Sequence, residues 1–265
     1  MTAKKTGHLL LFFVGYAMIG MEIVCRGEGI RIKSEKRRKD MKITFLGTGA
    51  ADWNLQLHKE WNGFRRNSSV LIDDTLLIDP GPDVPDALMT FGKNADEIRY
   101  VLNTHRHRDH FDETTLSQLG NAVLYTMSPD EVISLGKYTV KALAANHKTC
   151  PSGCTHFLIS DGEKSLFYGL DGAWLTYEEV ASIQENGVDL AVLDATVGEV
   201  KGDYRIFEHN NLNMVREIKA TLAPYIKRFV ISHMARTLHT SHAELCECMA
   251  RDGIEVACDG LELTV

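Results

Sequence analysis

The sequence predicts an α+β domain in which β-sheets are flanked by helices. From Met41 onward, short runs rich in β-branched and aromatic residues alternate with helical stretches, and such runs occur both early and late. The composition is that of a globular protein, because 44% of the 265 residues are hydrophobic and 25% are charged. No Pro/Ser-rich linker divides this part of the chain. We therefore expect one domain, and we favour this class over a β-sandwich.

The first 40 residues differ in charge from the rest of the chain. They contain nine Lys and Arg and four Asp and Glu, whereas the other 225 residues contain 20 basic and 32 acidic side chains. Their apolar run, residues 9–21, is shorter than the roughly 20 residues that span a bilayer. No small-x-small cleavage site follows, and the basic stretch after the run disfavours export. We expect residues 1–40 to be an appendage, native or translated from a start codon upstream of Met41, with membrane attachment as the alternative.

Strands are predicted where β-rich runs are bounded by Gly, Asp or Asn. The pair Asp161-Gly162 separates two of these runs and is typical of a tight hairpin turn. The expected strands are residues 42–46, 69–72, 76–78, 100–103, 122–125, 138–144, 157–160, 165–168, 190–193, 229–232 and 254–257.

Helices are predicted at residues 174–186, 212–223 and 242–251. The last begins with Ser241-x-x-Glu244, a capping box in which each side chain can satisfy a free backbone N–H at the helix start.

The six cysteines are too sparse for a disulfide scaffold. The pairs Cys150/Cys154 and Cys246/Cys248 have a spacing that can chelate a structural metal, but two such loose pairs are a weak signal. We therefore expect free thiols and a reduced, cytoplasmic protein.

The most informative motif is His105-x-His107-x-Asp109-His110, which directly follows an apolar strand. Imidazoles and carboxylates are ligands that zinc, iron and manganese prefer. Two ligand pairs in one loop suggest two metals, with His105 and His107 directed to one and Asp109 and His110 to the other. The alternative, a polar surface loop, does not explain three histidines and an aspartate in this spacing.

Two metals need more ligands than one loop supplies, and three further candidates follow predicted strands. His147 follows residues 138–144, Asp171 follows residues 165–168 and His233 follows residues 229–232. A single histidine after a strand is more often a hydrogen-bonded loop residue. Together with the first motif, however, these residues are predicted to complete the metal site.

This set of residues resembles the metallo-β-lactamase superfamily. The segments Ile43-Thr-Phe-Leu-Gly-Thr-Gly49 and Leu77-Ile-Asp-Pro-Gly81 are also similar to it, so the resemblance covers residues 41–265. It implies an αβ/βα four-layer sandwich, metallo-β-lactamase-like, with a site for two divalent transition metals, zinc or manganese, with iron as a third candidate. In that comparison Asp171 bridges both metals, His147 completes the first site and His233 the second. Asp79 either orients a ligand from beneath the loop or only forms the turn.

The C-terminal part is similar to one branch of the superfamily, the phosphoribosyl cyclic phosphodiesterases and their relatives near transfer-RNA 3′-processing endonucleases. The similar segments include Asp194-Ala-Thr196 and His209-Asn-Asn-Leu212. In this comparison His209 is a non-ligand histidine that assists phosphodiester cleavage; the alternative is a helix-start residue. The phosphodiesterase has a Cys-rich zinc site after its first strand, whereas this chain has a segment without cysteine, Asp52 to Trp61. That departure leaves the substrate open and argues for a relative of that enzyme.

The resemblance implies a metal-dependent hydrolase of a small phosphodiester, linear or cyclic, in which a hydroxide bridging the metals attacks the phosphorus. Asp109 and Asp171 hold the hydroxide, and protonated His209 donates a proton to the leaving oxygen. One alternative is ester or lactone hydrolysis on the same metal centre. The other is a non-catalytic, metal-bound sensor or accessory protein.

The partner predicted for this domain is a small-molecule substrate. Its excess of acidic residues argues against a large nucleic acid, because phosphate contacts need clustered Lys and Arg. Arg65, Arg66, Arg106 and Arg108 are expected near the mouth of the site, where they are candidates for holding one phosphate group. We expect no stable membrane anchoring, and a homodimer remains open.

Overall fold

The computed structural model describes residues 40–147 and 153–265, which belong to one compact unit. Cys25, Cys150 and all of the expected appendage except Asp40 lie outside the described residues. None of the helices within the described ranges has the length and apolar character needed to cross a membrane.

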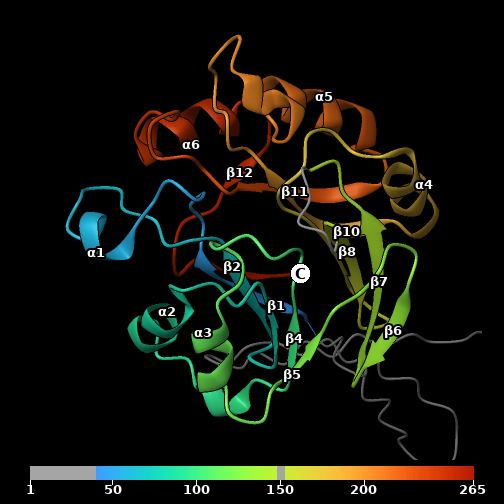
Figure 1. Cartoon of the computed structure of the whole chain (residues 1–265). Coiled ribbons are helices and arrows are strands. Elements are labelled where there is room, and N and C mark those ends of the chain that lie inside the picture. Colours follow the sequence, from blue (N-terminus) through green and yellow to red (C-terminus); the bar gives the residue numbers. More distant parts are fainter. Residues whose placement is uncertain (1–39, 148–152) are drawn as a thin grey trace, which may run out of the picture. The chain divides into compact units, whose positions relative to one another are not determined.

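Two mixed sheets form the centre of the unit (Figure 1). The first has the strand order β13 (Glu262–Thr264), β1 (Lys42–Gly47), β2 (Ser69–Ile72), β3 (Leu76–Ile78), β4 (Tyr100–Leu102) and β5 (Val123–Tyr125). The second has the order β12 (Glu255–Val256), β11 (Ile226–Ser232), β10 (Val188–Asp194), β9 (Ser165–Gly169), β8 (Thr155–Ser160), β7 (Tyr138–Ala144) and β6 (Val132–Leu135).

The parallel strands of each sheet place their carboxyl ends at the same edge of that sheet. Strands β3, β4 and β5 are parallel to one another, and so are β9, β10, β11 and β12, while the other pairs are antiparallel. The carboxyl ends of parallel strands lie at the same edge of a sheet, where loops can carry functional side chains.

Helices cover the outer faces of both sheets (Figure 1). Helices α2 (Val84–Thr90) and α3 (Glu113–Gln118) cover the first sheet, and α4 (Tyr177–Asn186), α5 (Leu212–Leu222) and α6 (His242–Ala250) cover the second. The short helix α1 (Leu55–His58) lies outside these clusters, and two 3₁₀ turns are η1 (Ala95–Glu97) and η2 (Tyr204–Phe207).

The hydrophobic core consists of three clusters that separate four layers. Between the sheets, Phe45 of β1 belongs to the same buried cluster as Phe157 of β8. Leu88 of α2 packs on the outer face of the first sheet, while Val215 of α5 and Met249 of α6 belong to the cluster on the outer face of the second sheet. The predicted α+β sandwich with helix, sheet, sheet and helix layers is therefore confirmed.

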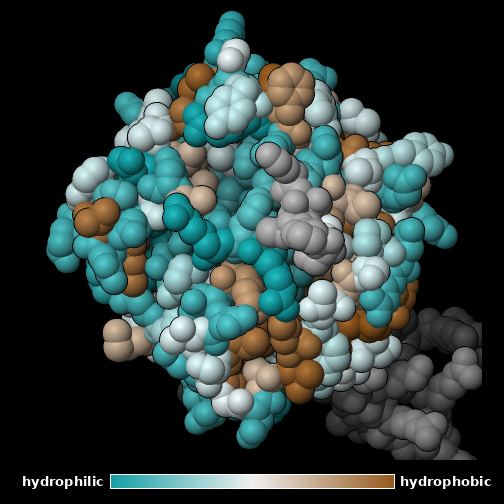
Figure 2. Space-filling model, in the orientation of Figure 1, coloured by the Kyte–Doolittle hydropathy of each residue, from teal (hydrophilic) through white to brown (hydrophobic). Residues whose placement is uncertain are grey.

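The surface follows from this layering. Figure 2 shows a mostly hydrophilic face, with hydrophobic residues gathered near its lower centre, where β5 forms an edge of the first sheet. Val123 of β5 is 52% exposed.

All of the expected strands are present, with bounds that differ by at most three residues. The Asp161-Gly162 turn joins antiparallel β8 and β9, and the Asp161 carboxylate accepts a hydrogen bond from the Lys164 N–H. Strands β6 and β13 and the short helices α1, α2 and α3 were not predicted from the sequence. These elements have only three to seven residues, too few for a clear periodic pattern.

The expected helix at residues 174–186 begins later, at Tyr177. Thr176 is its N-cap: its side chain accepts from the Glu179 N–H, and the Glu179 carboxylate accepts from the Thr176 N–H. Trp174 has a φ of 60°, which is outside the helical region. The predicted capping box of Ser241 and Glu244 is confirmed at the start of α6.

One glycine allows the loop after β4 to pass close to the turn after β3. A Cβ atom added at Gly81 would lie 2.2 Å from the backbone oxygen of Asp109. A larger residue would therefore displace the backbone that carries the predicted metal ligands.

The capping box gives a prediction about stability. We expect Ser241→Ala to lower the free energy of unfolding by about 1 kcal/mol, because the Glu244 N–H loses its acceptor. Urea denaturation followed by circular dichroism measures this change. Ser117→Ala, at an exposed position of helix α3, is the control and should change stability far less. Equal effects of the two substitutions would contradict the role of the cap.

Candidate metal centre

The predicted metal-binding loop connects β4 to α3 at the carboxyl end of a buried strand. His105 is 2% exposed and His110 is fully buried, while Arg106 and Arg108 between them are exposed. The alternating exposure shows that the loop turns its histidines inward and its arginines toward solvent.

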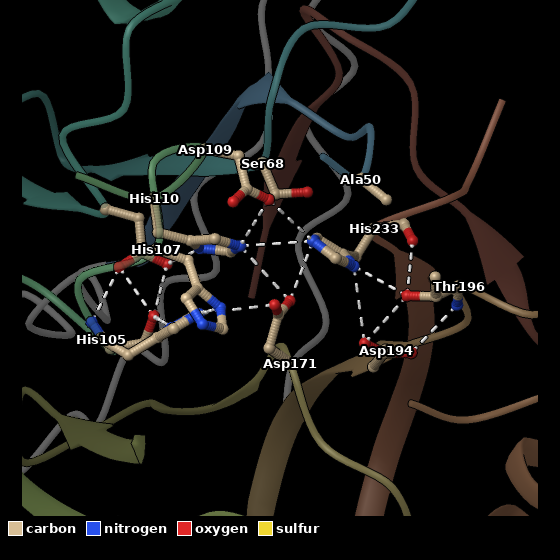
Figure 3. A network of polar contacts seen from close by, with 12 residues as sticks. Ala50, Ser68, His105, His107, Asp109, His110, Asp171, Asp194, Thr196 and His233 are labelled. Carbon is tan, nitrogen blue, oxygen red and sulfur yellow. Dashed lines mark hydrogen bonds and ion pairs between the residues drawn. The ribbon is translucent and has the colours of Figure 1, made fainter. Parts of the chain in front are cut away.

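Three other strand ends of the second sheet face this loop. His147 follows β7, Asp171 follows β9 and His233 follows β11. Asp171 and His233 have φ values of 54° and 61°, and such left-handed backbone costs about 1–3 kcal/mol at a residue other than glycine. Figure 3 shows that the side chains of Asp171 and His233 point toward His110. The sharp turns thus direct side chains from the second sheet toward the first.

The structure brings all seven predicted ligands together in two clusters that share Asp171. In each cluster, the candidate ligand atoms lie within 4.8 Å of one another. The first cluster contains His105, His107, His147 and Asp171, and the second contains Asp109, His110, Asp171 and His233. This division agrees with the ligand sets implied by the family resemblance. The role of these residues as ligands stays a prediction.

A third group contains Asp171, His233, Asp194 and His209. His209 Nδ1 donates a hydrogen bond of 2.8 Å to Asp194 Oδ2, and the His209 ring stacks on that of His233 with centroids 5.4 Å apart. Asp194 was not among the site residues predicted from the sequence. The signal was present, because Asp194 ends a buried strand, β10, beside the strand that precedes Asp171.

Asp79 orients two histidines from beneath the loop. Its Oδ2 accepts a 2.8 Å hydrogen bond from His110 Nδ1. The Thr104 hydroxyl donates to Asp79 and can accept from His105 Nδ1, which lies 3.0 Å away. Both contacts place the proton on Nδ1 and leave Nε2 of each ring available inside the clusters. Asp79 also forms the turn, with a φ of 61°, so both readings of this residue hold.

Burial and charge act differently on the two clusters. Burial lowers the pKa of His105 to about 2 and also lowers that of His147, so both rings are neutral, which is the form that binds metals. Burial also lowers the pKa of His110 and His233, but nearby carboxylates, above all Asp171, outweigh it and raise both pKa values well above the usual value. Positive charge is thus favoured around the shared carboxylate.

The surroundings of one buried oxygen, Asp171 Oδ1, indicate whether a cation fits between the two clusters. Asp171 Oδ1 makes no hydrogen bond, although His233 Nε2 lies 2.9 Å away and His110 Nε2 3.3 Å away. A buried carboxylate oxygen without a hydrogen bond is costly, and a coordinated cation removes that cost. The imidazole nitrogens and carboxylate oxygens of the clusters suit divalent transition metals. These residues therefore fit metal binding, while the number and identity of the ions stay a prediction.

The expectation that Arg65 and Arg66 lie at the mouth of the site is wrong. Both are buried, and each has its own partners. Arg65 Nη1 donates to Thr48 Oγ1 at 2.6 Å, and Arg66 Nη2 lies 2.5 Å from Asp86 Oδ2. A buried guanidinium needs such partners, so these two side chains stabilise the fold instead of facing a substrate.

The two loop arginines differ from each other. The guanidinium of Arg106 lies 4.3 Å from the ring centroid of Phe111, a cation–π contact. Arg108 lines a pocket of about 620 Å³ that also includes Asp109. Of these two arginines, Arg108 is therefore the one that lines a pocket together with a predicted metal ligand.

The cysteine-free segment, residues 52–61, contributes residues 52–58 to the lining of this pocket. Trp53 and Arg236 line the pocket. The Arg236 guanidinium lies 5.3 Å from the Trp61 ring centroid, and Arg236 Nε donates to the Asp52 carbonyl at 3.1 Å. The segment that departs from the family pattern therefore lies at this pocket, and none of its residues belongs to the groups of potential metal ligands.

The described cysteines are free thiols, as expected: Cys154, Cys246, Cys248 and Cys258. Within residues 40–147 and 153–265, no group of three or more potential metal ligands includes a cysteine. The pair Cys150/Cys154 is only half described, because Cys150 lies outside those ranges.

Part of the sequence is similar to a known family. The family model "Anti-Pycsar protein Apyc1" matches residues 41–118. A protein of that name from Paenibacillus sp. (strain J14) is 42% identical over 71 residues, which are 26% of this chain and 26% of that protein. In Pyrococcus abyssi (strain GE5 / Orsay), the UPF0173 protein PYRAB01190 is 29% identical over 106 residues. The matches span 26% and 48% of the lengths of these two curated relatives.

Similarity to solved structures extends over most of the chain. The metallo-β-lactamase fold protein YhfI from Bacillus subtilis has a TM-score of 0.67 and 17% identity, covering 86% of this chain and 100% of that one. A diphosphatase from the PhnP family has a TM-score of 0.65 and 20% identity, covering 84% of this chain and 97% of the other. Together with the two sheets and their outer helices, these likenesses show that the chain has the metallo-β-lactamase fold.

Proposed function

We propose that the protein is a hydrolase with two divalent metal ions that cleaves a small phosphodiester, linear or cyclic. The observation that carries this proposal is the pair of clusters sharing Asp171, with His209 beside them. Of the structural neighbours, the diphosphatase supports chemistry at phosphorus. Two bound divalent cations lower the pKa of a water molecule and neutralise charge on phosphoryl oxygens.

The chain's own residues supply positioning and proton transfer. Carboxylates of Asp109 and Asp171 face each other across His110, because His110 Nε2 lies 3.3 Å from an oxygen of each. They are thus placed to accept hydrogen bonds from a nucleophilic water molecule. This arrangement aligns the nucleophile before the substrate arrives.

His209 has the geometry of a general acid. Its Nδ1 donates to Asp194, and among the described residues its Nε2 has no hydrogen-bond partner. Burial lowers the His209 pKa, but the Asp194 carboxylate outweighs this effect and raises it. The protonated ring can therefore donate from Nε2 to a leaving oxygen, while Asp194 stabilises its charge.

The pocket favours a small substrate. Its volume of about 620 Å³ is in the usual range for small-molecule sites. Arg108 and Arg236 provide positive charge in its lining, next to Asp109. We infer that a phosphodiester lies between these arginines and the metal clusters.

Metal removal tests the proposal. We expect the purified full-length chain to contain two divalent metals and to hydrolyse bis(4-nitrophenyl) phosphate, with activity lost after chelation. His107→Ala, which removes one ligand of the first cluster, should lower turnover at least about a hundredfold. Metal analysis and release of 4-nitrophenol measure both effects.

The matched control is His242→Ala, a histidine on α6 outside all three groups of potential ligands. Its metal content and turnover should equal those of the wild type. A wild-type chain without metal, or unchanged turnover in His107→Ala, would refute the proposal. Preference for a panel of lactones over phosphodiesters would favour carbonyl chemistry at the same centre.

The role of His209 predicts a dependence on the leaving group. His209→Ala should lower turnover of a cyclic phosphodiester, whose leaving group is an alkoxide, by about 10²–10⁴-fold. The loss should be much smaller for bis(4-nitrophenyl) phosphate, because 4-nitrophenolate leaves without being protonated. Steady-state kinetics on both substrates measure this difference. Equal losses on both would exclude general acid catalysis by His209.

A further inference from the structure

A buried acid–histidine pair lies behind the shared carboxylate, outside both metal clusters. His156 of β8 is 1% exposed and Glu179 of α4 is fully buried. His156 Nδ1 lies 2.5 Å from Glu179 Oε1, and His156 Nε2 lies 3.2 Å from the backbone oxygen of Asp171. One imidazole thus links helix α4 to the backbone of the residue that both clusters share.

Hydrogen-bond chemistry determines which ring nitrogen of His156 carries a proton. A carbonyl oxygen can only accept, so the contact with Asp171 requires a proton on Nε2. The other oxygen of Glu179 accepts from the Thr176 N–H at 2.6 Å, which holds the carboxyl group in place. Whether the proton between Glu179 and His156 lies on Oε1 or Nδ1, Nε2 remains the donor to Asp171.

The backbone that receives this hydrogen bond is strained and tightly packed. Asp171 has a φ of 54°, which must be enforced by its surroundings. A Cβ atom added at Gly172 would lie 2.5 Å from Cε1 and 2.9 Å from Nε2 of His156, so the ring packs directly on this turn. The peptide after Asp171 therefore cannot rotate without breaking the contact with His156.

The orientation of that peptide determines where the carboxylate points. Oδ1 of Asp171 lies 2.9 Å from His233 Nε2 in the second cluster. Oδ2 lies 3.6 Å from His105 Nε2 and 3.7 Å from His147 Nε2 in the first. A rotation of the backbone would turn one oxygen away from its cluster.

We propose that His156, oriented by Glu179, is a positioning residue that holds Asp171 so that its carboxylate serves both metal clusters. The inference rests on the proposed two-metal function. Partners that orient a ligand without touching the metal typically contribute a factor of about 10–100 to metal affinity.

The test is a titration of the metal-free full-length chain with Mn²⁺, followed by electron paramagnetic resonance. The signal of free Mn²⁺ reports affinity and stoichiometry, and magnetic coupling between two bound ions reports a shared carboxylate. We expect His156→Ala and Glu179→Ala to bind the second Mn²⁺ about 10–100-fold more weakly than the wild type and to lose the coupling.

Two matched variants separate positioning from stability. Glu179→Gln should keep wild-type binding, because the amide can accept from the Thr176 N–H and donate to His156 Nδ1, leaving Nε2 as donor. Thr176→Ala should lower the melting temperature by removing the acceptor of the Glu179 N–H, but should leave affinity and coupling unchanged. If His156→Ala does not fold, two other comparisons replace it. One is His156→Gln, whose amide can donate to the Asp171 carbonyl. The other is the comparison of Glu179→Ala with Glu179→Gln.

The outcomes distinguish this inference from the proposed function. Wild-type affinity and coupling in His156→Ala would overturn the inference, and so would equal weakening in Thr176→Ala and Glu179→Ala. A wild-type chain that binds no pair of Mn²⁺ ions would overturn the proposed two-metal function as well.

Discussion

The site depends on one buried carboxylate that faces two groups of histidines. Asp171 is 2% exposed. A buried carboxylate destabilises the fold unless positive charge or hydrogen-bond donors surround it. Its two oxygens meet histidines that follow β4, β7 and β11, so the carboxylate joins both sheets. The relative position of the sheets is therefore part of the site, and the core between them contributes to the chemistry indirectly.

Three histidines in and around the clusters are each paired with a buried acid. Asp79 approaches His110 from below, Asp194 approaches His209, and Glu179 approaches His156. In each pair a buried acid contacts one ring nitrogen, and the other nitrogen remains available for its predicted role. That role is metal binding at His110, proton donation at His209 and donation to the Asp171 carbonyl at His156. Backbone strain at Asp79, Asp171 and His233 accompanies this arrangement, as expected where surrounding structure enforces unusual conformations.

Much of the fold was predictable because long buried strands have a clear pattern, and the candidate site was predictable because one motif contains four potential ligands within six residues. The positions of the other candidate ligands followed from side chains at strand ends. Other features depend on tertiary contacts that no local pattern encodes. His156 lies within a strand, where it resembles an ordinary core residue, and Glu179 looks like the acid of a helix cap. Arg65 and Arg66 were misplaced because their partner carboxylates and carbonyls are distant in sequence.

The segment from Asp52 to Trp61 supplies residues 52–58 of the pocket lining and is fixed by contacts of its own side chains. Trp53 Nε1 donates to the Met234 carbonyl at 3.0 Å, and its ring contacts His58 edge-on, with centroids 5.9 Å apart. None of the seven predicted ligands belongs to this segment. The lining of this pocket therefore comes partly from the segment and partly from the loop that carries the predicted ligands, through Arg108 and Asp109. Substitutions between residues 52 and 58 would change the lining of the pocket without altering any predicted ligand.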